Sequence, residues 1–210
     1  MPSFAIRDGH TALLVLDMYR FTVSRDHGFG RIAGERGIVR ELGEYYDQLD
    51  QALPNVSHLV DGCRRHRLPI VFTRLVAGRL QDVASQARVT GFWAMADSPE
   101  AEFLPGLVPA AGERVIDRTT TSALATPPLH EVLRAHGTRG LIICGVLANA
   151  AVEHTARDAA DLDYGVIVVS DACAAETWAI HAFVMTTLVG GLIRTRTTQG
   201  VLEMLEGTRT

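Results

Sequence analysis

Short apolar runs without polar alternation recur along the chain and dominate its pattern. Each run holds four to six apolar or β-branched residues, as in "TALLVLD" from Thr11 and "GLIICGV" from Gly140. Such runs are typical of strands that are buried on both faces of a sheet. They predict strands over residues 11–17, 68–74, 114–118, 140–146, 164–172 and 190–195.

Between most of these runs, apolar residues recur at helical spacing. Pro54 should end the first helix, because proline removes a backbone donor and crowds the preceding turn. Pro128 suits a helix start, and Gly137 suits a helix stop. The predicted helices cover residues 36–53, 55–67, 128–137, 149–162 and 176–188.

Alternating strands and helices predict an α/β fold with three layers (α/β/α), in which helices cover both faces of a central sheet. We expect a six-stranded, mostly parallel, Rossmann-like sheet. At 210 residues, the whole sequence 1–210 fits one such domain. The irregular segments 19–29 and 76–103 are expected to form the pocket wall, although a loop as long as the second also suits a subunit contact or a surface excursion.

Composition narrows the class of partner. The sequence is 47% hydrophobic and 21% charged, and its net charge of −4 comes from interspersed acids and bases. It has no basic stripe typical of a nucleic-acid surface and no apolar run of about 18 residues that would predict a membrane span. The first residues also lack a secretory signal pattern, so we expect a cytoplasmic protein with a small-molecule partner.

The cysteines and histidines show no metal-binding spacing. Cys63, Cys144 and Cys173 are widely separated and form no CxxC pair. Cys144 lies inside an apolar run, and we interpret it as a small core residue rather than a nucleophile. The eight histidines show no HxH or HExxH spacing, so no metal site and no cofactor are expected.

Candidate chemistry follows the strands, because ligands of open parallel sheets bind beyond the carboxyl ends of the strands. Asp17 follows the first run, where burial would raise the pKa of its carboxyl group and a nearby cation would lower it. This carboxylate suits a general acid or base, although a helix cap or a partner for a structural arginine fits equally well. Arg118 follows the third run and suits either an ion pair with Asp17 or a clamp on an anionic substrate.

The segment "GVLANAA" of residues 145–151 leads from the fourth strand into a helix. Free backbone N–H groups at a helix start, together with the helix dipole, suit an oxyanion or a carboxylate. Many α/β enzymes place their nucleophile at this turn, but position 151 of this chain is an alanine.

Five segments carry a family resemblance: "TALLVLDMYRF", "LPIVFTR", "VIDRTTTSAL", "LIICGVLANAAVEHTARDAADLDYGVIVVSDACAA" and "GGLIRTRTTQGVLEML". Through them the chain resembles the isochorismatase-like hydrolases, also called cysteine hydrolases, over almost the full length. The head segment "GFGRIAGERGIVRELGEYYDQLDQALPNV" is more similar to the amidohydrolase-type branch. The resemblance implies the α/β/α fold, a small-molecule hydrolase, and a homodimer or homotetramer.

In the amidase members of the family, an aspartate, a lysine and a cysteine form the catalytic triad. Asp17 matches the aspartate, Arg118 stands at the lysine position, and Ala151 stands at the cysteine position. The resemblance also implies a cis peptide bond between residues 146 and 147. The residues expected to contact substrate are Val146, Leu147, Ala150, Phe21, Thr73, Ser122 and Trp93.

Three interpretations of Ala151 remain open. The chain is a C–N hydrolase whose cysteine has been replaced, although Arg118 is then a second, unexplained departure. Alternatively, it works without a covalent intermediate, with Asp17 as general acid or base and Arg118 as electrostatic clamp. Or it binds a metabolite without turnover. We favour the second interpretation and expect a carboxylated or amide-bearing metabolite, such as one from a biosynthetic pathway.

Overall fold

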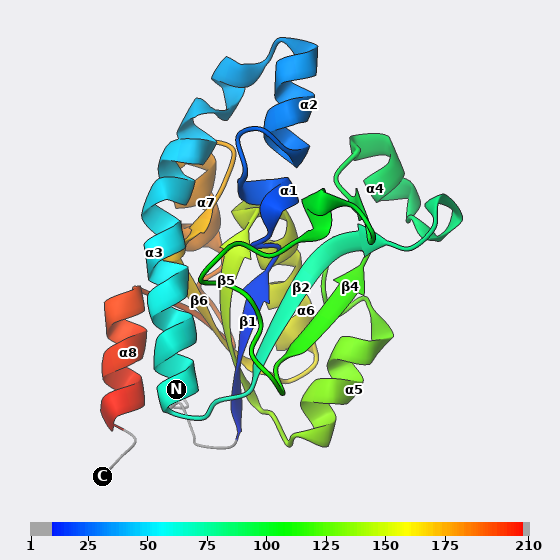
Figure 1. Ribbon diagram of the computed structural model, residues 1–210. Helices are drawn as coiled ribbons and strands as arrows, with labels where there is room; N and C mark the ends of the chain where they lie inside the picture. Colours follow the sequence, from blue (N-terminus) through cyan, green and yellow to red (C-terminus); the bar gives the residue numbers. More distant parts are fainter. Residues whose placement is uncertain (1–9, 208–210) are drawn as a thin grey trace.

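A parallel β-sheet forms the centre of the molecule (Figure 1). The computed structural model describes residues 10–207. Its strand order is β3-β2-β1-β5-β6-β7, and β4 pairs with β2 along the edge that β3 also joins. The strands are β1 (Thr11–Leu16), β2 (Ile70–Ala77), β3 (Ala94–Met95), β4 (Arg114–Arg118), β5 (Gly140–Val146), β6 (Gly165–Ala174) and β7 (Ile193–Arg196).

The six predicted strands are confirmed, and the seventh strand is the two-residue β3 within the irregular segment 76–103. Every strand pair is parallel. All six residues of β1 are buried, because β1 lies between β2 and β5 and has a core on each face. This double burial explains the absence of polar alternation in the sequence.

Helices cover both faces of the sheet and complete three layers (Figure 1). Leu13 and Val15 of β1 face the first core, together with apolar residues of α3 (Gly43–Arg65) and α8 (Thr198–Gly207). Leu14 and Leu16 face the second core, to which α5 (Pro127–Ala135), α6 (Glu153–Asp161) and α7 (Trp178–Thr187) contribute. The predicted α/β/α architecture is therefore confirmed.

The prediction of two helices divided at Pro54 was wrong. One helix, α3, runs from Gly43 to Arg65 with Pro54 inside it, and a 3₁₀ turn over Val39–Leu42 precedes it. Buried residues on both sides of the proline, including Leu49 and Val56, pack on the sheet. This tertiary burial outweighs the hydrogen bond that proline cannot donate.

Two irregular segments meet above the carboxyl ends of the strands. The Gly28 N–H donates to Glu100 Oε1 at 2.9 Å, and Tyr19 forms an isolated antiparallel bridge with Phe103. These contacts hold the segments together over β1 and β2. Their short helices are α1 (Arg20–Val23), α2 (Gly28–Arg36), α4 (Ser85–Thr90) and the 3₁₀ turns Leu80–Asp82 and Pro99–Ala101.

Candidate functional site

Asp17 lies directly after β1 and is almost completely buried, with 1% of its surface exposed. Thr73 Oγ1, from β2, donates to Asp17 Oδ1 at 3.1 Å. Arg118 Nη2, from the end of β4, donates to Asp17 Oδ2 at 2.5 Å. The backbone of Asp17 has a φ of 56°, a left-handed conformation that the Thr22 hydroxyl supports by donating to the Asp17 carbonyl.

Burial raises the pKa of Asp17 to about 6, against the lowering effects of the Arg118 charge and of the hydrogen bonds from Thr73 and Arg118. A pKa in this range allows one carboxyl group both to accept and to release a proton near neutral pH. The geometry and the pKa therefore suit general acid–base chemistry at Asp17.

Arg118 faces Asp17 rather than the cavity that Asp17 lines. Its side chain is fully buried, Nη1 donates to the Thr120 carbonyl, and Nε has no hydrogen-bond partner among the described residues. Arg118 lines a separate hollow beside Val76 and Thr126. Its proposed clamp on substrate stays a prediction, whereas its ion pair with Asp17 is formed.

The arginine at position 118, where the family amidases have a lysine, agrees with the composition of the whole sequence. The combined number of lysine and arginine residues is 20, and all of them are arginine. An arginine at position 118 therefore follows the usage of the rest of the chain, which weakens its value as evidence for altered chemistry at this one site.

The turn after β5 has the backbone that the resemblance implied. The Val146–Leu147 peptide bond is cis. Gly145 has a φ of 120°, and a Cβ atom there would lie 2.0 Å from the Leu16 carbonyl oxygen, so only glycine fits beside β1. A single π-helical turn, Ala148–Val152, then leads into α6.

Asp17 and Ala151 line the same cavity, which has a volume of about 520 Å³. Ala151 is 3% exposed and carries only a methyl group at the position of the family nucleophile. Val146, Leu147 and Ala150 also line this cavity, where they were expected to contact substrate.

Four other residues expected to contact substrate lie elsewhere. Phe21 stacks on Tyr19 within the first core. Thr73 reaches Asp17 but not the cavity wall, and the Ser122 hydroxyl accepts from the Leu124 N–H. Trp93 packs against a small apolar cluster that includes Ala87. Contact of these residues with substrate stays a prediction.

The irregular segments form much of the cavity wall, as predicted, but through residues other than those expected to contact substrate. Phe29 and Phe92 bring the two segments together, with ring centroids 4.5 Å apart. Gln86 and Thr90 extend this wall. Aromatic residues in both segments were the available signal, but only the fold shows which of them meet.

Three polar residues near the helix start were also missed as site residues. Asn149, His154 and Glu176 line the cavity. Asn149 Nδ2 donates to Glu176 Oε2 at 3.0 Å, and His154 Nδ1 lies 2.9 Å from the Ala150 carbonyl. Glu176 lies two residues after the end of β6 at Ala174. The predicted strand ended at residue 172, so Glu176 was not recognised as a residue at a strand end.

The cysteines do not supply a substitute nucleophile. Cys63, Cys144 and Cys173 are free and buried. Burial raises the pKa of Cys63 and of Cys173 to about 12 and raises that of Cys144 well above its ordinary value. Each group is therefore a thiol near neutral pH, and the interpretation of Cys144 as a core residue is confirmed.

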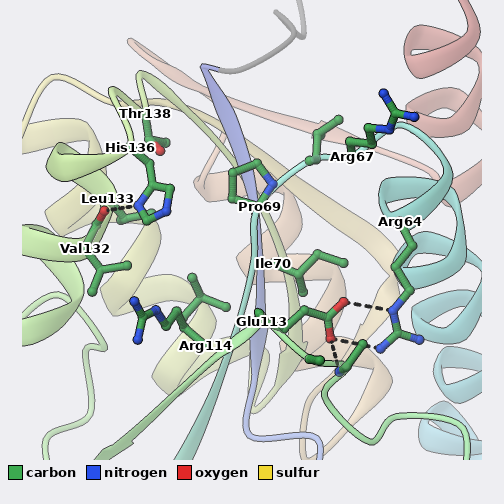
Figure 2. A pocket seen from close by; sticks show the side chains of 15 residues that line it. Arg64, Arg67, Pro69, Ile70, Glu113, Arg114, Val132, Leu133, His136 and Thr138 are labelled. Carbon is green, nitrogen blue, oxygen red and sulfur yellow. Dashed lines mark hydrogen bonds and ion pairs between the residues drawn. The ribbon is translucent and has the colours of Figure 1, made fainter.

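A second hollow, of about 450 Å³, lies at the opposite end of the sheet, near the starts of β2 and β4 (Figure 2). Arg64 reaches across it and donates to both carboxylate oxygens of Glu113, at 2.8 and 2.9 Å. His136 and Arg114 lie on the side formed by α5 and β4. This hollow lacks a buried acid comparable to Asp17.

Residues 10–207 contain no cluster of three or more His, Cys, Asp or Glu side chains that could hold a metal ion. Within the same residues, no helix is both long and apolar enough to span a bilayer. The expected homodimer or homotetramer and the cytoplasmic location stay predictions.

The structure is a three-layer α/β/α domain in which a buried aspartate and a strand-to-helix turn line one cavity. The isochorismatase domain model matches residues 11–199. The chain belongs to the isochorismatase family.

Relatives and solved structures agree with this assignment. The chain is 28% identical over 176 residues to the uncharacterized isochorismatase family protein YwoC of Bacillus subtilis, covering 82% of this chain and 90% of that protein. It is 30% identical over 140 residues to enterobactin synthase component B of Escherichia coli, covering 65% of this chain and 48% of that protein. The chain thus spans about half of the enterobactin protein.

Two crystal structures extend the comparison. A cysteine hydrolase from Pseudomonas syringae superimposes with a TM-score of 0.83 at 21% identity, covering 98% of this chain and 96% of the other. N-carbamoylsarcosine amidase from Thermoplasma acidophilum gives a TM-score of 0.71 at 25% identity, with coverage of 90% and 96%.

Proposed function

We propose that this chain is a small-molecule hydrolase that works through Asp17 without a covalent enzyme intermediate. The observation that carries the proposal is the buried Asp17 carboxyl group, which lines the same cavity as the nucleophile-free turn at Ala151. Position 151 carries only a methyl group and the three cysteines are buried thiols, so the proposal takes water as the nucleophile.

Asp17 is the proton-transfer group in this proposal. The Asp17 carboxylate accepts a proton from water as the water oxygen attacks the substrate carbon, and the same proton then passes to the departing nitrogen or oxygen atom. The pKa of about 6 matches both steps. In this proposal, backbone N–H groups of the turn after Leu147, other than those of Ala150 and Val152, which donate to the Leu147 carbonyl, stabilise negative charge that develops on the substrate oxygen.

Arg118 acts through Asp17 in this mechanism. The short ion pair fixes one carboxylate oxygen, and the hydrogen bond from Thr73 fixes the other. Arg118 is therefore a positioning residue that holds the carboxylate in place and limits the rise of its pKa. It does not need to contact substrate for this role.

The test compares turnover by the unmodified protein with turnover by Asp17→Asn. Products from a panel of amides, ureas and enol ethers are identified by mass spectrometry. We expect Asp17→Asn to lower kcat/KM by about 10²- to 10⁴-fold, because the amide side chain cannot transfer the proton. The variant also leaves Arg118 buried without its ion-pair partner, so circular dichroism must verify that it is folded under the assay conditions. Asp117→Asn is the matched control, because Asp117 lies in β4 next to Arg118 but pairs with the half-buried Arg74 and does not line the cavity.

A second candidate function is amide hydrolysis by the cysteine mechanism of the family, which requires a cysteine in place of Ala151. The structural likeness to N-carbamoylsarcosine amidase favours it. Ala151→Cys distinguishes the two functions. Conversion only by this variant supports the second function, whereas conversion by the unmodified protein that depends on Asp17 supports the first. Turnover that survives in Asp17→Asn contradicts our proposal.

A further inference from the structure

We infer that the cavity selects substrates that present hydrogen-bond donors, such as a neutral amide or a cationic amidine or amine, and that it rejects carboxylates. The inference rests on the proposed function in taking the cavity at Asp17 as the active site. It assigns a substrate class and gives Glu176 the role of a specificity residue.

The charges around the cavity disfavour an anionic ligand. Among the described residues that line it, the acids are Asp17 and Glu176, and there is no arginine or lysine. Arg118 offsets the charge of Asp17 from outside the cavity wall. Glu176 is bonded instead to the uncharged amide of Asn149, so its carboxylate leaves a local negative charge in the cavity.

Hydrogen-bond acceptors dominate the polar groups near the helix start. Asn149 Oδ1 is a buried acceptor without a partner, and the second oxygen of Glu176 remains beside it. His154 Nδ1 donates to the Ala150 carbonyl, because a carbonyl oxygen only accepts, so a neutral His154 leaves Nε2 as an acceptor. A ligand N–H satisfies such groups better than a second acceptor does.

Most hydroxyl protons in the cavity wall are already committed to backbone carbonyls. Thr22 Oγ1 donates to the Asp17 and Tyr19 carbonyls, and Thr90 Oγ1 donates to the Gln86 carbonyl. Thr119 Oγ1 donates to the Asp82 carbonyl. Gln86, Thr121 and the second Nδ2 hydrogen of Asn149 keep donors for a ligand oxygen, which suits a carbonyl group.

Helix starts attract anions in many proteins, and here the Glu176 carboxylate already lies at the helix start. Asn149 lies in the first turn of the helix that begins at Ala148, and its side chain binds the Glu176 carboxylate. A second carboxylate would lie beside Glu176 and repel it. A neutral carbonyl oxygen near this turn, where the Ala150 and Val152 N–H groups already donate to the Leu147 carbonyl, avoids that repulsion.

Three probes of nearly equal shape test the charge preference. Benzamidine, benzamide and benzoate share a phenyl ring that suits the wall of Phe29 and Phe92, and they differ in charge and in donors. Binding to the full chain is measured by ligand-observed NMR and by calorimetry at pH 7.5. We expect benzamidine to bind most tightly, benzamide next, and benzoate at least about tenfold more weakly than benzamidine.

Two variants test whether Glu176 causes the preference for benzamidine. Glu176→Gln keeps an oxygen that can accept from Asn149 but removes the charge, so benzamidine affinity should fall about tenfold while benzamide affinity stays within about twofold. Glu153→Gln is the matched control, because Glu153 pairs with Arg157 and does not line the cavity. Circular dichroism verifies folding of both variants.

Several outcomes overturn the inference. Benzoate binding as tightly as benzamidine contradicts it, as does an equal loss in both glutamate variants. Failure of benzamidine to bind at its highest soluble concentration also contradicts it. These binding measurements need no turnover, so they can fail or succeed independently of the proposed function. A preference for benzamidine that depends on Glu176 stands even if Asp17→Asn retains activity.

Discussion

The two ends of the sheet both carry arginine–carboxylate pairs, but they place them in different surroundings. At the carboxyl end, Arg118 and Asp17 have side chains that are 0% and 1% exposed. At the amino end, Arg64 and Glu113 are 30% and 11% exposed (Figure 2). The same pair of functional groups therefore has two different consequences, because water solvates one pair and is excluded from the other.

The pKa shifts show this difference directly. Burial is the largest influence on both acids and raises their pKa. For Asp17 it prevails, and the pKa rises to about 6. For Glu113 the hydrogen bonds from Arg64 and from the Ala110 N–H prevail together with the Arg64 charge, and the pKa falls below its ordinary value. Depth of burial, rather than the presence of an arginine, makes Asp17 suitable for proton transfer.

The largest expected effect is the difference in stability loss when the arginine of each pair is replaced by leucine. Arg118→Leu should lower the free energy of unfolding by about 3–5 kcal/mol at pH 7.5, because it leaves a buried carboxylate without its partner. Arg64→Leu should cost about 1 kcal/mol or less, since Glu113 remains partly solvated. Urea denaturation of both variants measures the difference.

The pH dependence of the Arg118→Leu loss provides a check. Without Arg118 the pKa of Asp17 rises further, so protonation relieves the uncompensated charge as the pH falls, and the loss of stability should shrink towards pH 5. Combining Asp17→Asn with Arg118→Leu should recover part of the stability. Equal losses for Arg118→Leu and Arg64→Leu would remove the contrast between the two ends.

A smaller effect concerns the pH profile of activity. If Asp17 accepts a proton from water, kcat/KM should fall about tenfold per pH unit below a pKa of about 6. Thr73→Val removes a hydrogen bond that lowers this pKa, so the falling limb should move to higher pH. Thr73→Ser keeps the hydroxyl and should leave the limb in place, which separates the hydrogen bond from simple packing. A limb that does not move in Thr73→Val argues against Asp17 as the titrating group.

The smallest expected effect lies at the amino end. Arg114→Gln should change the free energy of unfolding by no more than about 0.5 kcal/mol and leave kcat/KM within about twofold, because the exposed Arg114 side chain lies far from the carboxyl ends of the strands. Denaturation and steady-state kinetics measure both quantities. A large loss of activity would show that the two ends of the sheet are coupled.

Much of the fold was predictable because it depends on local patterns. Strands such as β1 and β5 are buried on both faces, so their apolar runs identified them without any partner. Pro54 was misinterpreted for the opposite reason. The local rule ends a helix at proline, whereas burial of Leu49 and Val56 on the sheet keeps α3 continuous.

The candidate site divides in the same way. Asp17 and the turn at Ala151 follow predicted strands, so the topology of a parallel sheet was enough to bring them to one edge. The pairing of Asn149 with Glu176 and the meeting of Phe29 with Phe92 join residues far apart in the chain. No local pattern specifies such contacts.

The sequence by itself determined the strand and helix order, the family, and the absence of a side-chain nucleophile at position 151, because each depends on residue identity or short-range periodicity. Only the tertiary structure decided that Arg118 serves Asp17 instead of the cavity, and that the cavity wall carries acids and acceptors without an arginine. Side-chain direction, burial and electrostatic environment depend on the packing of distant segments, and this packing exists only in the folded chain.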